Sequence, residues 1–547
     1  MCGIAGFFGL AAVAPDVPAR MLDVLRQRGP DAQHSVFWDE RFQRTDGPAH
    51  NALLHARLSI IDPRPEADQP MSNAAGDVWI CYNGEVYDWT AAADELKSGG
   101  YVFRNRSDTE FILHAYEAWG IDCVSRLRGM FAFAILDLRR QEAWLVRDRM
   151  GLKPMVYSVV DGQLAFGSTV RAVLPFLPSS KRRFSPESID AYLAHRYVPA
   201  PRTIFSDISR LENGHCLRFD LRTRQLEKRR YWHPVPRGGD WLEALDQAVQ
   251  MRTVADRPLG VFLSGGVDST AIACRLAKLG HERLQTFTAA FPGSPLDESA
   301  QAGETARRLG LENLAIPISE DIATDFERIV ADLDEPFADP SSVPTWYLAK
   351  ETTRHVKVVL GGEGGDELLA GYKRLGQHMR SRWRRGLRLP FLPMPSSPAR
   401  GGMAKIATEA RMSWKDAYSL RFSGFGPQQR RYLQGGRPLD HLHYWRAPDR
   451  PGDSALMELL ELDWANYLPE YILRKADLCT MAHGLELRAP MLDQVFFQTL
   501  LGLPEARRFT RPPKKLLEPA VEVVRDLDVF GRKKRGFNPP LGPWLQG

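Results

Sequence analysis

An apolar run that ends in a glycine-rich turn constrains this chain more than any other feature. Residues 259–263 (LGVFL) have the pattern of a buried strand, and residues 271–276 place apolar side chains on one face of a helix. Gly265 and Gly266 stand at the turn between the two, where the lack of a Cβ lets backbone N–H groups approach an anion. The start of a helix favours an anion at the same point. The stretch therefore predicts a phosphate site in a strand–turn–helix unit.

The polar residues of this turn indicate which kind of phosphate loop it is. It lacks the lysine of a GxxxxGK[ST] loop, so it does not grip terminal phosphates as a Walker A loop does. Ser264, Ser269 and Thr270 offer hydroxyls, and Asp268 offers a carboxylate to Mg²⁺. SGGVDS resembles the pyrophosphate loop of the ATP pyrophosphatases, which split ATP into AMP and pyrophosphate while they activate an acid. The glycine pair alone is equally compatible with an ordinary strand–helix turn.

Length and composition predict a soluble protein of several domains. The 547 residues exceed the usual size of one core and suggest roughly two to four domains. The net charge of +5 is small against 72 basic and 67 acidic residues, so nucleic acid is not implied as a partner. The six cysteines form no CxxC pair, which favours a reducing compartment and argues against a zinc site. No apolar run approaches the ~20 residues of a transmembrane helix, so we expect a cytoplasmic protein without a membrane partner.

The first residues, MCGIAGFFGLAAVA, offer a choice between a signal peptide and a strand that carries a nucleophile. No Lys or Arg precedes the apolar run, and its glycines suit a strand better than an inserting helix. If Met1 is removed, Cys2 carries a thiol and a free α-amine with a pKa of about 8, which can serve as the general base of that thiol. Taken alone, a cysteine at this position is more often a small buried apolar residue.

Further motifs in the first half favour the nucleophile. MCGIAG is followed in order by RQRGPD (26–31), HARLSIID (55–62), NGEVY (83–87), SDTE (107–110) and RDRMGLKPMVY (147–157). Together they resemble the class II glutamine amidotransferase domain, an α/β/β/α fold of the N-terminal-nucleophile hydrolases. Short β-prone runs at 78–82, 132–136 and 143–146 agree with such a fold. Gln27 and Thr169 depart from the His and Glu that are usual in that family.

The resemblance implies a role for each matching residue. Cys2 is the nucleophile, and the Asn83 side chain with the Gly84 N–H forms the oxyanion hole. Arg57 holds the carboxylate of glutamine, while Asp108 and Glu85 hold its amine and amide end, as expected from charge pairing with a free amino acid. The residues expected to bind glutamine are Arg57, Leu58, Ile60, Ile61, Asn83, Gly84, Glu85 and Asp108.

In the second half, strand and helix patterns alternate after the phosphate loop. Strands are predicted at 284–291, 314–318 and 356–360, with helices at 298–309, 323–333 and 343–355 between them. This order predicts a doubly wound parallel sheet with a helical C-terminal part, and ligands bind beyond the carboxyl ends of such strands. A stretch rich in Pro and Arg precedes it, so we expect a glutaminase domain at 1–210, a linker at 211–240 and a synthetase domain at 241–547.

GGEGGDELLAGY (361–372) follows the last predicted strand of this series. Asp366 offers a second carboxylate for Mg²⁺ opposite Asp268. Glu363 is a charged group within the cleft, or alternatively only a partner of the helix dipole. The residues expected to bind ATP are Leu263, Ser264, Gly265, Gly266, Asp268, Ser269, Thr270, Ala289, Gly361 and Gly362.

ILRKADLCTMAHGLELRAPMLD (472–493) and RKKRGFNPP (532–540) extend the resemblance over nearly the whole chain, to the glutamine-hydrolysing asparagine synthetase family. It implies that Lys534 neutralises charge during adenylation, that Glu363 is also catalytic, and that ATP and Mg²⁺ are used. Ammonia released at Cys2 then passes inside the protein to an acyl-adenylate. A tRNA-modifying ATP pyrophosphatase and a catalytically silent relative are the alternatives, and the intact Cys2 motif disfavours both.

The segment DEPFADPSSVPTWYLAK (334–350) should lie beside the cleft, and we expect it to bind the acceptor substrate. Asp339, Ser341 and Ser342 are expected to hold an amino group and a carboxylate, and Arg488 a second carboxylate. L-aspartate is the predicted acceptor, and a uronic acid of a polysaccharide precursor is the alternative. The expected partners are therefore small molecules, and a homodimer is compatible with such a chain.

Overall fold

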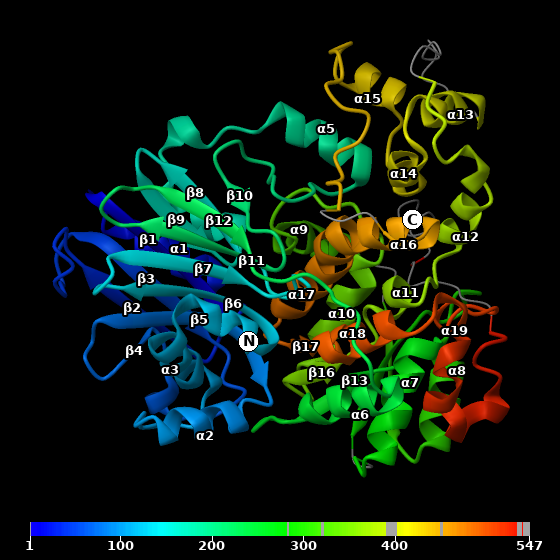
Figure 1. Ribbon diagram of the computed structural model, residues 1–547, viewed down its shortest axis with the longest axis horizontal. Helices are drawn as coiled ribbons and strands as arrows, with labels where there is room; N and C mark the ends of the chain where they lie inside the picture. Colours follow the sequence, from blue (N-terminus) through cyan, green and yellow to red (C-terminus); the bar gives the residue numbers. More distant parts are fainter. Residues whose placement is uncertain are drawn as a thin grey trace.

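The computed structural model describes residues 2–281, 284–318, 322–389, 402–448, 452–532 and 539. Figure 1 shows a first half built mainly of strands beside a second half that is richer in helices. Within the described residues, no helix is long and apolar enough to cross a membrane.

Two six-stranded antiparallel sheets form the first half. The first sheet has the order β10 (Ser209–Arg210), β8 (Val156–Val160), β9 (Gln163–Gly167), β1 (Gly3–Val13), β3 (Ala49–Arg57) and β2 (Ala32–Trp38). The second has the order β12 (Leu226–Arg230), β11 (His215–Asp220), β7 (Glu142–Arg147), β6 (Arg128–Asp137), β5 (Val78–Tyr87) and β4 (Met71–Ser72).

The side chains of these strands alternate between an inner and two outer cores. Phe8 of β1 packs between the sheets with Leu145 of β7, whereas its neighbour Phe7 points outward to Met21 of α1 (Asp16–Leu25). α4 (Val170–Val173) lies on the same outer face, while α2 (Thr90–Ser98) and α3 (Asp108–Trp119) cover the outer face of the second sheet. The predicted α/β/β/α order is confirmed.

The predicted linker at 211–240 is wrong over much of its length. β11 and β12 lie inside this range, and β11 pairs with β7 from Cys216 opposite Val146 to Asp220 opposite Glu142. Leu217 and Phe219 are buried between the sheets, so this segment belongs to the first half. β12 is mostly exposed at the sheet edge and its sequence is charged, so the sequence did not predict the β11–β12 hairpin. Only the exposed residues 235–240 connect this hairpin to α6 (Trp241–Met251), and within them the Arg237 N–H donates to the Gln498 carbonyl at 2.8 Å.

A five-stranded parallel sheet organises the second half. Its order is β15 (Glu312–Pro317), β14 (Gln285–Ala290), β13 (Leu259–Phe262), β16 (Val358–Leu360) and β17 (Glu486–Arg488), and every pair is parallel. The three strands predicted after β13 are confirmed, as are α8 (Ser299–Arg308), α9 (Ala323–Asp332) and α10 (Ser342–Thr352) between them. The strand order reverses between β13 and β16, which is where doubly wound sheets bind ligands.

Helices make up most of the remainder of the second half. In chain order these are α7 (Val267–Lys278), α11 (Gly365–Leu368), α12 (Lys373–Met379), α13 (Gly402–Arg411), α14 (Trp414–Ala417), α15 (Pro427–Leu433), α16 (Ala455–Leu462), a π-helical segment (Asp463–Leu473), α17 (Arg474–Met481), α18 (Gln494–Gly502), α19 (Glu505–Arg508) and a 3₁₀ segment (Lys515–Leu527). α7 packs against this 3₁₀ segment, and α10 packs against α17.

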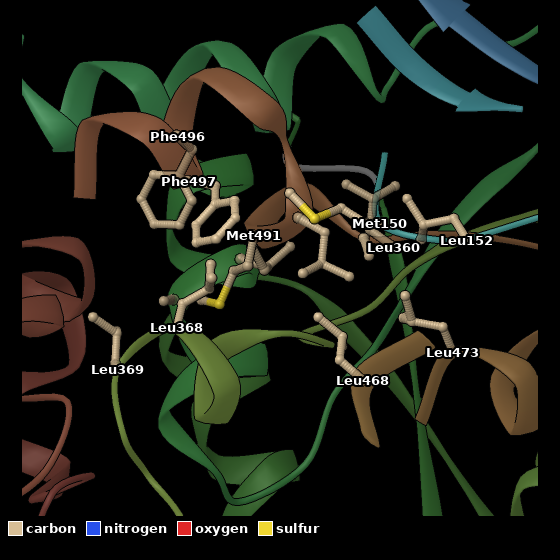
Figure 2. Packing of buried hydrophobic residues seen from close by; sticks show 14 of the residues in the cluster. Met150, Leu152, Leu360, Leu368, Leu369, Leu468, Leu473, Met491, Phe496 and Phe497 are labelled. Carbon is tan, nitrogen blue, oxygen red and sulfur yellow. The ribbon is translucent and has the colours of Figure 1, made fainter. Parts of the chain in front are cut away.

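One hydrophobic core joins the two halves. Met150 and Leu152 of the first half belong to the same buried cluster as Leu360, Leu473 and Met491 of the second. Figure 2 shows the two side chains approaching Leu360 and Leu473 at this junction. The relative position of the two halves is therefore fixed by packing rather than by the short connection alone.

Candidate functional site

The first candidate centre lies where β1 and β5 meet. Cys2 stands directly before β1, is buried, and donates from its backbone N–H to Asn83 Oδ1 of β5 over 2.8 Å. Burial raises the pKa of the Cys2 thiol. Among the described residues the Asn83 Nδ2 atom is buried and has no hydrogen-bond partner. A buried donor of this kind beside a thiol suits a developing oxyanion.

Gly84 is required by the pairing of β5 with β6. A Cβ on Gly84 would lie 2.2 Å from the Met130 carbonyl oxygen and 2.7 Å from Phe131 Cα, so any side chain would push the strands apart. This contact holds the Asn83–Gly84 segment in place opposite Cys2.

Asp108 and Glu85 are buried acids beside this centre. Asp108 Oδ2 accepts from Tyr82 Oη at 2.6 Å and from the Val86 N–H at 2.8 Å, and burial raises its pKa to about 6. Burial raises the pKa of Glu85 well above its usual value, and Asp108 adds to the effect. Buried carboxyl groups with few cationic partners, such as Asp108 and Glu85, are suited to binding an ammonium group.

Arg57, at the end of β3, is engaged by a loop. Its guanidinium donates to the Arg64 carbonyl at 3.1 Å, to the Asp62 carbonyl at 2.5 Å, and to the Asp68 carboxylate. Of the remaining predicted glutamine-binding residues, Leu58 and Ile60 are buried in the core between the halves, and Ile61 packs on it. Asp68 was not predicted, because nothing in its local sequence separates it from other loop acids.

The second candidate centre begins with the phosphate loop after β13. Ser264 Oγ accepts from the Gly266 N–H at 3.2 Å, and the Ser264 N–H donates to Ser269 Oγ at 3.1 Å. Thr270 Oγ1 donates to the Gly266 carbonyl at 2.8 Å, and Gly266 precedes the first turn of α7. The predicted strand–turn–helix unit is confirmed. Of the other predicted ATP residues, Leu263 directly after β13 and Ala289 in β14 are both buried.

The loop after β16 packs directly on the phosphate loop. A Cβ on Gly362 would lie 2.8 Å from the Ser269 backbone nitrogen, and one on Gly365 would lie 2.5 Å from Asp268 Cγ. A Cβ on Gly361 would meet the Glu363 carboxylate. Contact between two loops is a reason for these glycines that the sequence analysis did not anticipate.

Asp268 and Asp366 are brought together as predicted, and a lysine joins them. Lys514 Nζ pairs with Asp268 and lies 2.5 Å from Asp366 Oδ1. Burial alone would lower the pKa of Lys514, but the two carboxylates raise it. The sequence RPPKKLLEP does not distinguish Lys514 from its exposed neighbour Lys515, so Lys514 was missed. Lys534 lies outside the described residues.

The predicted acceptor segment faces a second lysine that was missed. Lys475 Nζ of α17 donates to Ser341 Oγ at 3.0 Å and lies 3.6 Å from Asp339 Oδ2. The Asp339 carboxylate also accepts from the Ser341 N–H at 2.9 Å. Ser342 Oγ is buried and unpaired within the described part of the chain. The ILRKAD motif contains Lys475, but spacing alone did not show which way its side chain points.

Glu363 connects the nucleotide loops to this segment. Its Oε2 atom is buried and accepts no hydrogen bond from any described residue. Burial raises the pKa of Glu363, with Lys475 opposing the rise and Asp268 adding to it. A buried carboxylate with a raised pKa that interacts with both Lys475 and Asp268 is suited to proton transfer.

Arg488 does not belong to the acceptor site. Its side chain is fully buried at the end of β17, where it donates to the Arg252 carbonyl at 2.9 Å, the Val254 carbonyl at 2.6 Å and Glu486 at 2.6 Å. It also lies 3.5 Å from Glu85 of the first half. With its donors used at the boundary between the halves, Arg488 is removed from the predicted acceptor set.

Comparison with known proteins agrees with this arrangement. Residues 240–547 match the family model described as asparagine synthase, and residues 1–232 match the glutamine amidotransferase domain. The chain belongs to the asparagine synthase family. It is 32% identical to asparagine synthetase [glutamine-hydrolyzing] 1 of Bacillus subtilis, over the whole chain and 88% of that protein. The putative asparagine synthetase [glutamine-hydrolyzing] of Mycobacterium tuberculosis is 33% identical over the same shares.

A more distant relative in the same family carries a different name. The amidase chyE of Penicillium rubens is 27% identical over the whole chain and 90% of that protein. As a member of the asparagine synthase family with both domains, the chain is a carbon–nitrogen ligase that uses glutamine and ATP to form an amide.

Proposed function

We propose that this asparagine synthase family member converts L-aspartate to L-asparagine, with ATP cleaved to AMP and pyrophosphate. The observation that carries the proposal is the group of Asp339, Ser341 and Lys475 next to Glu363. An amino acid acceptor brings a carboxylate for the lysine and an ammonium for the aspartate. A uronic acid has no ammonium, so Asp339 would gain no partner from it. The names of the relatives in Bacillus and Mycobacterium support the same acceptor.

In the glutaminase half, Arg57 takes the α-carboxylate of glutamine and Asp108 its ammonium. Once Met1 has been removed, the α-amine of Cys2 accepts the thiol proton and the sulfur attacks the γ-amide carbon. Asn83 Nδ2 and the Gly84 N–H stabilise the oxyanion that forms. The α-ammonium of Cys2 then returns the proton to the leaving nitrogen, the C–N bond breaks to release ammonia, and water hydrolyses the remaining thioester to glutamate.

In the synthetase half, the phosphate loop binds the nucleotide through its hydroxyls and N–H groups. Asp268 and Asp366 already surround a cationic group, the Lys514 ammonium, so they fit a Mg²⁺ ion as carboxylate ligands. Bound Mg²⁺ would neutralise charge on the phosphates. Lys475 and Ser341 hold the acceptor so that its reacting carboxylate attacks the α-phosphorus and pyrophosphate leaves.

Glu363 accepts a proton when ammonia attacks the acyl-adenylate. Its buried position and raised pKa make it a better base at neutral pH than an exposed glutamate. AMP leaves as the amide forms, and Glu363 then passes the proton to water.

The test supplies ATP, Mg²⁺ and ammonia with L-aspartate, L-glutamate or a uronic acid in parallel. AMP and the amide product are measured. Saturable asparagine formation, reduced in Lys475→Met and Asp339→Asn through a higher KM for aspartate, supports the proposal. AMP formation with a uronic acid and none with aspartate would overturn it.

A further inference from the structure

The guanidinium assigned to the carboxylate of glutamine is already occupied by an acid of the same chain. Arg57 is almost fully buried, and besides two loop carbonyls it pairs with Asp68. We propose that Asp68 is an internal competitor that sets the affinity of the glutaminase site for glutamine. Its carboxylate takes the place of the α-carboxylate of the substrate, and glutamine must displace it to bind. This inference rests on the proposed role of Arg57.

The loop at 62–69 explains why Asp68 reaches Arg57. The Asp62 and Arg64 carbonyls accept from the two terminal nitrogens of Arg57, which folds the loop around the guanidinium. Asp68 follows a 3₁₀ turn at Pro65–Ala67 and is held there by its N–H bond to the Pro65 carbonyl at 2.9 Å. The two carbonyls are neutral, so the charge of Arg57 is balanced within this loop by Asp68.

Asp68 also has a partner to which it can move. His34 Nε2 of β2 lies 3.1 Å from Asp68 Oδ2. The Asp68 side chain is 25% exposed and that of His34 is 44% exposed, against 7% for Arg57. Asp68 therefore lies on the solvent side of the guanidinium. When it leaves Arg57, the carboxylate remains near His34 and water instead of being stranded in the interior.

Binding is then an exchange of one carboxylate for another on Arg57. The net gain for glutamine is the difference between its own pair with Arg57 and the pair that it breaks. An analogue without an anionic α-group has nothing to offer the guanidinium and leaves Asp68 in place. Asp68 thus weakens the binding of glutamine, which must break the pair, and does not weaken the binding of an analogue that leaves the pair intact.

The experiment compares Asp68→Asn with Glu66→Gln in the full-length enzyme. Glu66 is exposed on the same loop, so its variant removes an equal charge without touching Arg57. We expect Asp68→Asn to lower the KM for glutamine about tenfold, the value of one hydrogen bond to a charged group, with kcat changed less than twofold. Hydrolysis of the α-amide analogue of glutamine should not improve, and ammonia-dependent synthesis should be unchanged.

His34→Ala gives a result of opposite sign. Without His34, Asp68 loses the side chain that lies 3.1 Å from its carboxylate and would hold it away from Arg57, so the KM for glutamine should rise. In Asp68→Asn the same His34→Ala change should have no effect on KM. Binding of glutamine to Cys2→Ala and to Cys2→Ala/Asp68→Asn, measured by calorimetry, checks the same affinities without turnover.

Two results would overturn the inference while leaving the proposed function intact. One is an active glutaminase whose KM is the same in wild type, Asp68→Asn and Asp68→Ala. The other is an equal improvement with glutamine and its α-amide, which would mean that Asp68 only obstructs the entrance. An absence of glutamine hydrolysis in the wild-type protein would instead contradict the proposed function itself.

Discussion

The two polar side-chain atoms of Asn83 have different roles. Oδ1 accepts from the Cys2 backbone nitrogen at 2.8 Å, while the buried Nδ2 is left for the substrate. Asn83→Asp keeps the acceptor and loses the donor, whereas Asn83→Ala loses both. We expect either change to lower kcat for glutamine hydrolysis roughly 10²- to 10³-fold, as for other oxyanion donors.

Ammonia-dependent synthesis is the control for both Asn83 variants, because it bypasses Cys2. If Asn83→Asp hydrolysed glutamine at the wild-type rate, Nδ2 would have no part in the oxyanion hole. If it impaired ammonia-dependent synthesis as well, the two centres would not be separable by mutation.

Lys514 is the counter-charge of the carboxylates assigned to Mg²⁺. Lys514→Met keeps the length of the stem and removes the charge, so Asp268 and Asp366 repel each other. We expect the variant to lose about 3 kcal/mol of folding stability in EDTA, as when one partner of a buried ion pair is deleted. Mg²⁺ should restore part of this loss and raise Tm more than it does in the wild type.

Lys515→Met is the matched control for this variant, since Lys515 is the exposed neighbour. Its Tm should follow the wild type with and without Mg²⁺. An equal response of Lys514→Met and wild type to Mg²⁺ would argue against a metal at Asp268 and Asp366.

The residues that the sequence revealed share one property. Cys2 stands directly before a strand, Asp268 follows a glycine turn, and Asn83 lies in β5 beside a glycine, so the local pattern already restricts each side-chain environment. Asp68 and Lys514 reach their sites from loops whose paths depend on the whole fold, so no local signal marks them. Arg488 was misplaced because composition cannot tell whether a buried arginine faces a ligand or another part of the chain.

At the scale of elements, the segment between α9 and α10 links the acceptor residues to the first half of the chain. Asp334 accepts from the Val170 N–H at 2.7 Å and the Arg171 N–H at 2.9 Å, at the start of α4 in the first half. Glu335 accepts from the Ile204 N–H at 2.7 Å and pairs with Arg210 at 2.6 Å. The second part of the same segment carries the proposed acceptor residues. The glutaminase half therefore positions the acceptor loop.

Removing the hydrogen bonds of Asp334 should weaken acceptor binding, although Asp334 is not one of the proposed acceptor residues. Asp334→Ala leaves two N–H groups of α4 unpaired, and we expect the KM for aspartate with ammonia as donor to rise roughly tenfold. Asp334→Asn keeps an acceptor and tolerates the left-handed backbone at φ 69°, so it should restore most of the loss. Glu327→Gln, exposed on α9, is the control. A change in kcat alone, with KM unaltered, would contradict a positioning role.

α11 contains an acid that makes stability depend on pH. Glu367 is buried, and burial together with Asp366 raises its pKa from 4.5 to about 7. Between these values the folded chain keeps a proton that the unfolded chain has lost, so stability falls as pH rises through this window. Glu367→Gln removes the penalty. Its advantage in the free energy of unfolding should be absent near pH 4 and reach at most about 3 kcal/mol above pH 7.

Chemical denaturation at pH 4.5 and pH 8 measures this difference. Glu505→Gln, exposed on α19, should give no pH-dependent gain. A gain for Glu367→Gln that is the same at both pH values would show that the raised pKa contributes nothing to stability.

The sequence predicted those elements whose own pattern is strong. β13, β14 and β16 are largely buried runs, and β13 to β16 were predicted as strands that follow one another along the chain with helices between them. β17 has three residues and exists because β16 offers it a parallel edge, so only tertiary contact creates it. β12 is charged and exposed, and it is a strand because β11 pairs with it. The hydrophobic periodicity of residues 226–230 and 486–488 therefore does not predict that β12 and β17 are strands.

At the scale of the whole molecule, buried ion pairs cross the boundary between the halves. Arg147 lies 2.9 Å from Glu470, Arg28 lies 2.9 Å from Asp477, and each of these side chains is at most 5% exposed. Glu470 also lies 3.2 Å from Arg210. Separating the halves would leave these charges unpaired in addition to exposing the shared core. The halves should therefore behave as one folding unit despite their two active centres.

A cleavable connection between the halves tests this expectation. Residues 235–240 are exposed, and a protease site placed at Gly238–Gly239 interrupts no strand or helix. After cleavage we expect the two fragments to co-elute and to unfold in one transition.

Glu470→Ala leaves Arg147 and Arg210 without their shared partner. This variant should destabilise the cleaved complex by about 3–5 kcal/mol, so that the fragments separate at a lower urea concentration. Glu95→Ala removes an exposed ion pair with Arg126 and should change the midpoint little, since such pairs are worth about 0–1 kcal/mol. Fragments that separate on cleavage alone, or equal effects of the two variants, would show that the buried pairs do not hold the halves together.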